Sequence, residues 1–195
     1  MTTEKKSFAH KQIQREFAVY KGKIIRVSNV GPKSRFECPQ YNCKEKDKVE
    51  CYKRKFFRHK VGCGCNFYRP SPSEGDSHKA AKCIVRYYLE SEKGLEYINT
   101  CTSKKLVRKL QLGERCDTEI QLSKFKTEFK GEADCSISKG NVLLFIVEVK
   151  HESGTEERPV DWVEFSVKDV VEKFRSKSEE PLRTLCKDDC KCKKK

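Results

Sequence analysis

The chain contains 195 residues and carries a formal net charge of +14. This length is enough for one substantial hydrophobic core, or for one core and a small additional module. Charged residues run through the first 17 positions, so we expect no secretory signal peptide, and no apolar run is long enough to span a membrane. We therefore expect an intracellular protein, nuclear or cytoplasmic, that has no membrane association.

The charge is distributed unevenly along the chain. Residues 1–112 carry 26 Lys and Arg against 11 Asp and Glu, whereas residues 113–195 carry 17 against 18. A basic half of this kind attracts a polyanion, and its affinity should fall as salt rises. The alternative is that the surplus lysine only keeps the protein soluble.

Basic and aromatic residues are interleaved over residues 51–60, within a first half that is rich in strand-forming residues. We expect a strand region over residues 17–30 that is interrupted at Lys21-Gly22. In residues 51–60, cations can neutralise phosphates and aromatic faces can stack on bases, which makes this segment a candidate nucleic-acid contact. The alternative is a strand with Phe56 or Phe57 in the core. The candidate contact residues are Lys53, Arg54, Lys55, Arg58 and Lys60.

Cysteine is unusually frequent, with twelve in the chain and six between Cys38 and Cys83. Without a signal peptide, disulfides are the weaker interpretation, because thiols stay reduced inside cells. Thiolates in a reducing compartment instead suggest structural Zn²⁺. The predicted ligands are Cys38, Cys43, Cys63 and Cys65, with His59 or Cys51 as substitutes.

Pro, Ser and Gly concentrate over residues 69–76, which predicts a loop and a soft domain boundary. Residues 82–101 then predict a β-hairpin with its first strand at residues 82–89. A short helix is predicted over residues 104–112, capped by Ser103, with Leu106, Val107 and Leu110 as its buried stripe. Residues 118–129 predict a further strand.

The segment from Gly131 to Lys150 is the most informative part of the sequence. An apolar run over residues 142–147 predicts a buried strand, and it ends in Glu148-Val149-Lys150. A hairpin centred on Asn141 places Asp134 opposite Glu148 and Glu132 opposite Lys150. Facing carboxylates repel each other, and a divalent cation between them reverses the sign of that interaction.

Two other arrangements of this segment are compatible with the sequence. A two-residue Lys139-Gly140 turn would place Asp134 and Glu148 on opposite faces of the hairpin. The hairpin end could also be solvated and held by a Glu132–Lys150 ion pair, with no metal ion.

Asp134, a hydrophobic strand and then Glu148-x-Lys150 resemble the PD-(D/E)XK nuclease superfamily, although Ala133 stands where its proline is usual. The resemblance covers about residues 103–186 and implies a metal site of Asp134, Glu148 and the Val149 carbonyl. It implies that Lys150 activates water and stabilises negative charge. An acid near the first helix often joins the metal ions of this superfamily, and here it would be Glu114 or Glu119.

The resemblance implies an α+β fold with an α/β nuclease core: a helix, a three-strand meander, a second helix and a further strand. The second helix is predicted over residues 161–177 with Asp161 as its cap, and the last strand over residues 182–186. The predicted domains are a basic, cysteine-rich, β-rich module at residues 1–76, the nuclease-like core at 77–186 and a basic tail at 187–195.

These features together predict a nuclease that requires Mg²⁺ or Mn²⁺ and hydrolyses phosphodiester bonds in nucleic acid. The resemblance favours DNA over RNA and also allows a homodimer. The alternative is a non-catalytic, zinc-stabilised nucleic-acid-binding protein with a degenerate nuclease fold. A third reading is an interaction or metal-handling protein that uses its thiols and has no affinity for nucleic acid.

Overall fold

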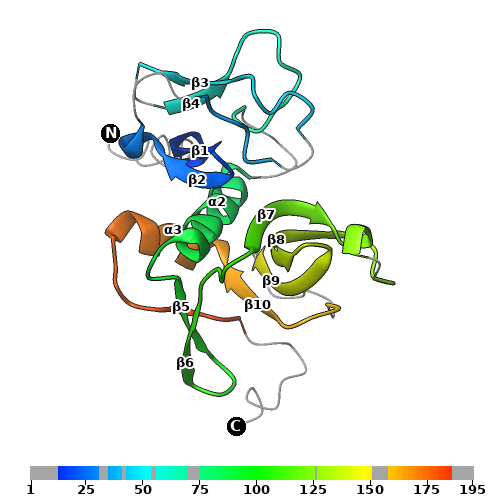
Figure 1. Ribbon diagram of the computed structural model, residues 1–195. Helices are drawn as coiled ribbons and strands as arrows, with labels where there is room; N and C mark the ends of the chain where they lie inside the picture. The colour runs from blue at the N-terminus through cyan, green and yellow to red at the C-terminus, as the bar shows by residue number, and fades with distance from the viewer. Residues whose placement is uncertain are drawn as a thin grey trace. The chain divides into compact units, whose positions relative to one another are not determined.

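The structure is a computed structural model that describes residues 13–30, 35–40, 43–53, 56–69, 75–125, 127–150 and 158–185. It has the predicted α+β fold, with two α-helices and eleven strands in the part that is described (Figure 1). Contacts divide the chain into two compact units, Met1–Cys83 and Ile84–Lys195. The predicted basic tail at residues 187–195 lies outside the described residues.

The first unit is built from two short antiparallel hairpins. Lys21 and Gly22 both have positive φ, 51° and 78°, as a two-residue hairpin turn with the strands' own twist requires. The interruption predicted within residues 17–30 is therefore confirmed. The elements are η1 (Ile13–Glu16), β1 (Phe17–Tyr20), β2 (Lys23–Arg26), η2 (Val27–Asn29), β3 (Val49–Tyr52) and β4 (Phe56–His59).

Helix α2 (Asp76–Glu90) replaces the strand that was predicted at residues 82–89. The β-branched and aromatic residues of this stretch favour a strand by propensity, and tertiary packing overrides that preference. Residues 79–86 are buried without interruption, and the apolar residues of α2 lie on one side of the helix, a helical periodicity that the strand prediction overlooked. Among the described residues, no helix combines the length and apolar character needed to cross a membrane.

Residues 104–112 do not form the predicted helix. Strand β6 (Lys104–Arg108) pairs instead with β5 (Leu95–Asn99), and β11 (Leu182–Arg183) completes a three-stranded sheet in the order β11-β5-β6. Leu106 and Val107, predicted to be a buried stripe, are 39% and 54% exposed. The helical spacing of these apolar residues was therefore coincidental, and pairing with β5 decided the conformation.

A four-stranded sheet in the order β10-β9-β8-β7 forms the centre of the second unit (Figure 1). Three of its strands form the predicted meander, and the fourth runs parallel to β9. The predicted strand at residues 118–129 ends at Gln121 and continues as a short 3-10 helix, η3 (Leu122–Phe125). The strands are β7 (Glu114–Gln121), β8 (Glu132–Lys139), β9 (Val142–Lys150) and β10 (Trp162–Ser166).

The second predicted helix begins later than the sequence suggested. Residues 162–166 form β10, and α3 (Val167–Ser176) follows with Ser166, not Asp161, as its cap. The Ser166 hydroxyl accepts a hydrogen bond from the Asp169 N–H at 3.5 Å. The first residues of the expected helix pair with β9 and therefore belong to the sheet. The last predicted strand is confirmed as β11.

One row of side chains that runs across this sheet is apolar. Cys135 pairs with Val147, which pairs in turn with Val163, and all three are at most 8% exposed. Phe165, two residues along β10 from Val163, is fully buried and meets Tyr97 edge-on at 5.8 Å between ring centroids. Because side chains alternate along each strand, the next row belongs to the opposite face.

We expect Phe165→Ala to lower the free energy of unfolding by about 3–5 kcal/mol, because it leaves a cavity in a fully buried site. Phe129→Ala, at a ring that is 38% exposed, is the matched control and should cost less than about 1 kcal/mol. Urea unfolding followed by the fluorescence of Trp162, the single tryptophan of the chain, measures both. Equal losses in the two variants would contradict this view of the core.

Candidate metal and catalytic sites

Asp134 and Glu148 lie on the two paired strands β8 and β9. Cys135 pairs with Val147, and the same register carried one residue further places Asp134 opposite Glu148. The Val149 N–H donates a hydrogen bond to Asp134 Oδ2 at 2.8 Å, which fixes the Asp134 carboxylate against β9.

A β-bulge, together with the turn, sets this register. The turn contains only Gly140 and Asn141, with Gly140 at φ 58°, so it is neither the Lys139-Gly140 turn nor a loop centred on Asn141. Between Ile137 and Ser138 the pairing shifts by one residue, which leaves Leu144 without a partner on β8. The extra residue brings the two acids into register.

Carboxylates continue in line across the whole sheet. Glu164 on β10 pairs with Glu148. On β7, the pairs on either side of Glu119 leave it facing Asp134. We call Glu119, Asp134, Glu148 and Glu164 the carboxylate row, and each is at most 9% exposed. Burial of four acids in neighbouring positions is costly unless cations or hydrogen-bond donors compensate their charge.

Two cations contact Glu148, one at each carboxylate oxygen. Arg158 Nε donates to Glu148 Oε1 at 2.7 Å, and Lys150 Nζ lies 3.9 Å from Glu148 Oε2. Burial, and then the charge of Asp134, raise the pKa of Glu148 to about 7, although Arg158 and Lys150 both act to lower it. Glu148 is therefore on the border of ionisation at neutral pH, and an added positive charge would favour its ionised form.

The structure separates the two weaker candidates for the metal site. Glu114 pairs with Lys139 at the far end of the β7–β8 ladder, about 17 Å of strand from the position of Glu119. Its carboxylate accepts a hydrogen bond from Arg108 at 3.0 Å, so Glu114 is excluded from the site. Glu119 has φ 55°, an unusual backbone conformation for a glutamate that often marks functional positions.

The hairpin end does not have the simple solvated form. Asp134 and Glu148 are buried, the Glu132 carboxylate accepts a hydrogen bond from the Gln121 amide at 2.6 Å, and Lys150 pairs with Glu148. The Val149 carbonyl stays a predicted ligand. Sequence reasoning missed Glu164 and Arg158, and the alternation of apolar Val163 and Phe165 with polar neighbours was the available signal for Glu164.

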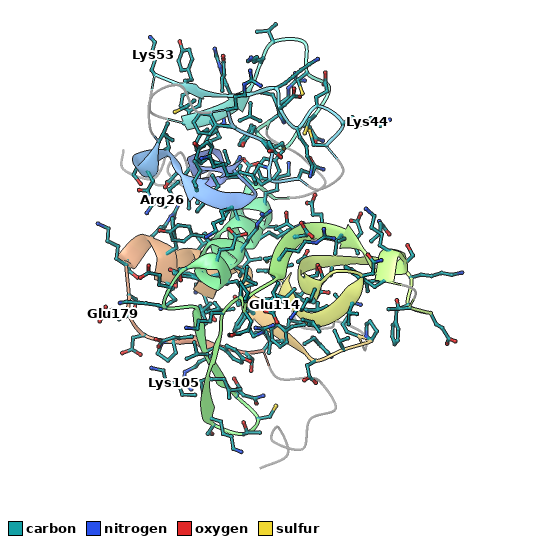
Figure 2. The ribbon with its side chains drawn as sticks, viewed as in Figure 1. Arg26, Lys44, Lys53, Lys105, Glu114 and Glu179 are labelled. Atoms are coloured by element: carbon teal, nitrogen blue, oxygen red, sulfur yellow. The ribbon has the colours of Figure 1, made fainter. Side chains whose placement is uncertain are left out.

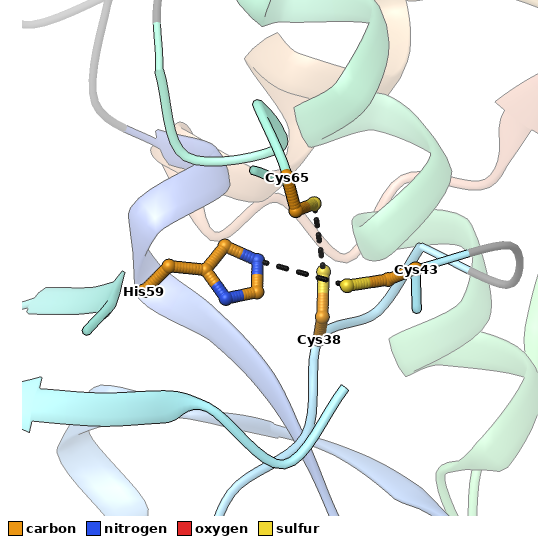
Figure 3. Close-up of side chains that lie close together, drawn as sticks. All are labelled: Cys38, Cys43, His59 and Cys65. Carbon is orange, nitrogen blue, oxygen red and sulfur yellow. Dashed lines mark hydrogen bonds between the residues drawn. The ribbon is translucent and has the colours of Figure 1, made fainter. Parts of the chain in front are cut away.

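A second group of potential ligands lies in the first unit. Cys38, Cys43, His59 and Cys65 each bring one ligand atom to within 4.8 Å of all the others (Figure 3). Within the described part of the chain no other three Asp, Glu, Cys or His ligand atoms are that close, the carboxylate row included. This group could hold a metal ion.

Hydrogen bonds prepare the four residues for a metal. His59 Nδ1 lies 3.3 Å from the Lys48 carbonyl, which can only accept, so Nε2 is left facing Cys43 Sγ at 4.0 Å. An outer partner of this kind orients a metal-binding histidine. Cys38 Sγ lies 3.9 Å from Cys65 Sγ, and this contact lowers the pKa of Cys65 to about 4. The lowered pKa of Cys65 favours its thiolate, the form that binds metals.

The structure corrects one predicted ligand. Cys63 is buried outside the group, and burial together with its hydrogen bond to the Glu45 carboxylate raises the pKa of its thiol. His59, named only as a substitute, takes the fourth position, and Cys51 on β3 is also outside the group. Glu45 also accepts a hydrogen bond from the Gly64 N–H at 2.8 Å, which shapes the turn that carries Cys65.

The predicted nucleic-acid segment forms the β3–β4 hairpin, except for Arg54 and Lys55, which lie outside the described residues. Arg58 pairs with Glu50 at 2.7 Å, and its guanidinium lies 3.9 Å from the centroid of the Tyr52 ring. Lys53 and Lys60 are exposed, and Figure 2 shows Lys53 pointing outward from this hairpin. Phe57 is fully buried, so the segment combines a core strand with exposed cations.

No family model, curated protein or solved structure matches this chain. The geometry of the two sites therefore carries the functional argument.

We expect His59→Ala and Cys65→Ser each to lower the metal content by one ion per chain, because each removes a ligand of a four-residue site. Cys63→Ser and Cys51→Ser are the controls and should keep that ion. Elemental analysis of the purified proteins, with thermal unfolding before and after chelation, measures the effect. Loss of the ion in Cys63→Ser but not in His59→Ala would show that the ligand set is wrong.

Proposed function

We propose that this protein is a nuclease of the PD-(D/E)XK type that requires Mg²⁺ or Mn²⁺. The observation that carries the proposal is the buried, in-register pair of Asp134 and Glu148 with the Lys150 ammonium 3.9 Å from Glu148. The pair fits a hard divalent cation, because both ligands are carboxylates. Burial beside Asp134 raises the pKa of Glu148 to about 7, so an added cation would favour its ionised form.

Each residue has a separate task in this proposal. Asp134 and Glu148 would hold the ion, with the Val149 carbonyl as a further ligand and Glu119 next along the carboxylate row. Lys150 is 34% exposed in its side chain, so its ammonium can reach a substrate phosphate and stabilise developing negative charge. A bound divalent ion supplies Lewis-acid chemistry and lowers the pKa of its water.

For the Cys/His group we propose structural Zn²⁺. Three thiols and one imidazole are a typical zinc ligand set, and four protein ligands leave no open position for catalysis. Cys38 follows the isolated bridge at Phe36, Cys43 precedes the turn at residues 44–47, and His59 ends β4. Cys65 lies in the loop that follows β4. A metal ion there would tie three loops of a unit whose strands are only four residues long.

Nucleic acid is the proposed substrate, with DNA favoured over RNA through the resemblance. The first unit contributes the exposed cations Lys53 and Lys60 and the partly exposed rings of Tyr52 and Phe56, whose centroids lie 5.3 Å apart. Cations that neutralise phosphates and aromatic rings that stack on bases suit a single strand or a frayed end.

One observation favours a second candidate function. Arg158 already supplies Glu148 with a cation, and a guanidinium in place of a metal ion is compatible with a degenerate nuclease fold in a zinc-stabilised nucleic-acid-binding protein. That protein would bind nucleic acid in a salt-sensitive manner and cut nothing when Mg²⁺ or Mn²⁺ is added.

Asp134→Asn, Glu148→Gln and Lys150→Ala should each lower Mn²⁺-dependent cleavage by on the order of 10²-fold or more, as removal of a transition-state contact does. Glu132→Gln is the control, because Glu132 is exposed, lies two residues from Asp134 and is bonded to Gln121. Gel assays on labelled DNA and RNA, with binding measured in parallel, separate catalysis from affinity. Wild-type rates in the three site variants would rule out this site.

The pKa of Glu148, raised from 4.5 to about 7, predicts how Mn²⁺ binding depends on pH. Below about pH 7 the folded protein holds a proton that a cation must displace, so affinity should fall about tenfold per pH unit there and level off above it. Calorimetry between about pH 5.5 and about pH 9, in a chain whose Cys/His group is already loaded, measures the profile. A flat profile below pH 7 would contradict the assignment of Glu148.

A further inference from the structure

The Arg158 side chain is placed to do more than neutralise a buried acid. It precedes β10, the strand that carries Glu164 beside Glu148, and it is 14% exposed while Glu148 is 1% exposed. Its Nε makes the hydrogen bond to Glu148 Oε1 at 2.7 Å. The two terminal nitrogens carry the other four of the five N–H groups, and among the described residues none of these has a hydrogen-bond partner. The guanidinium therefore keeps free donors at a partly open position.

The ion pair also conflicts with metal binding at the same carboxylate. A divalent cation held by Asp134 and Glu148 would share the Glu148 carboxylate with Arg158, and it would lie next to the fixed positive charge of that guanidinium. The cation and the Arg158 guanidinium carry like charges, and like charges held on one buried carboxylate repel each other strongly. Lys150 conflicts less with such a cation, because it is 3.9 Å from Glu148 and more exposed than Arg158. Arg158 is thus the group that has to move.

We propose that Arg158 is a phosphate-binding catalytic residue of this nuclease, which Glu148 holds in the metal-free protein and releases to the substrate when a divalent cation takes Glu148. The inference rests on the proposed function. Guanidinium and phosphate match as a bidentate pair, and release costs little when the carboxylate gains a new cation in exchange. The arrangement couples metal entry to the appearance of a phosphate-binding group.

The first test measures Mn²⁺ binding without nucleic acid, by calorimetry on the full chain at about pH 8.5, above the pKa of about 7 that Glu148 has in the wild-type protein. Arg158→Gln should bind Mn²⁺ about tenfold more tightly than wild type, because the competing charge is gone. Arg115→Gln is the matched control, since Arg115 pairs with Asp117 at 3.0 Å on the same sheet but outside the carboxylate row. Unchanged or weaker Mn²⁺ affinity in a folded Arg158→Gln protein overturns the proposal.

The second test follows the guanidinium directly and uses the wild-type protein, so it does not depend on the folding of a variant. The Arg158 Nε–H signal in ¹H–¹⁵N spectra, assigned by its absence in Arg158→Lys, should shift as Mg²⁺ is added. Its midpoint should equal that of Mg²⁺ binding, while the Arg115 signal stays in place. An Arg158 signal that does not move at saturating Mg²⁺ overturns the proposal.

The phosphate contact is tested by cleavage at saturating Mn²⁺, where Arg158→Gln should be slower by on the order of 10²-fold despite its tighter metal binding. Wild-type cleavage by that variant overturns the catalytic role. The outcomes separate the two proposals. If wild type cuts but Arg158→Gln binds Mn²⁺ no more tightly, the competition fails and the nuclease stands. If wild type binds Mn²⁺ in competition with Arg158 and cuts nothing, the nuclease fails.

Discussion

Buried carboxylates need positive charge or hydrogen-bond donors close by, and this constraint governs the sheet of the second unit. The row formed by Glu119, Asp134, Glu148 and Glu164 crosses all four strands, and each member is at most 9% exposed. The bulge at Ile137/Ser138 brings Asp134 into line with Glu148, and β10 adds Glu164 on the other side. A stable core alone would place apolar residues at these positions, so the row points to a function.

In the first unit the constraint is the small amount of apolar surface that its short elements can bury. Its hairpins are short and its loops long, which leaves limited apolar surface to bury. Cys38, Cys43, His59 and Cys65 come from separate loops and a strand end, and they converge to within 4.8 Å. Three thiols and an imidazole at this separation could share one metal ion. We propose that the two units use metals for different ends, the first to hold loops together and the second for chemistry.

Local sequence patterns predicted the structure correctly where residues adjacent in sequence determine the conformation. The β1–β2 hairpin follows from Lys21-Gly22, and the β8–β9 hairpin follows from the apolar run before Glu148. Local patterns failed where the conformation depends on segments that are distant in sequence. Residues 82–89 have strand propensity but lie in the largely buried helix α2, and residues 104–108 have helical spacing but pair with β5. The second outcome cannot be read from a window of residues, because packing against distant segments supplies the larger energy.

The candidate sites divide in the same way. The sequence by itself determined that Asp134, Glu148 and Lys150 belong to one hairpin, and that several thiols lie close enough along the chain to share an ion. Only the tertiary structure decided that His59 replaces Cys63, that Glu119 and not Glu114 joins the row, and that Glu164 and Arg158 stand beside Glu148. That β8 and β9 pair follows from the turn that joins them, and the bulge between Ile137 and Ser138 then sets the register of the two acids. The parallel pairing of β10 with β9 and the closure of loops around His59 depend on packing between segments far apart in sequence.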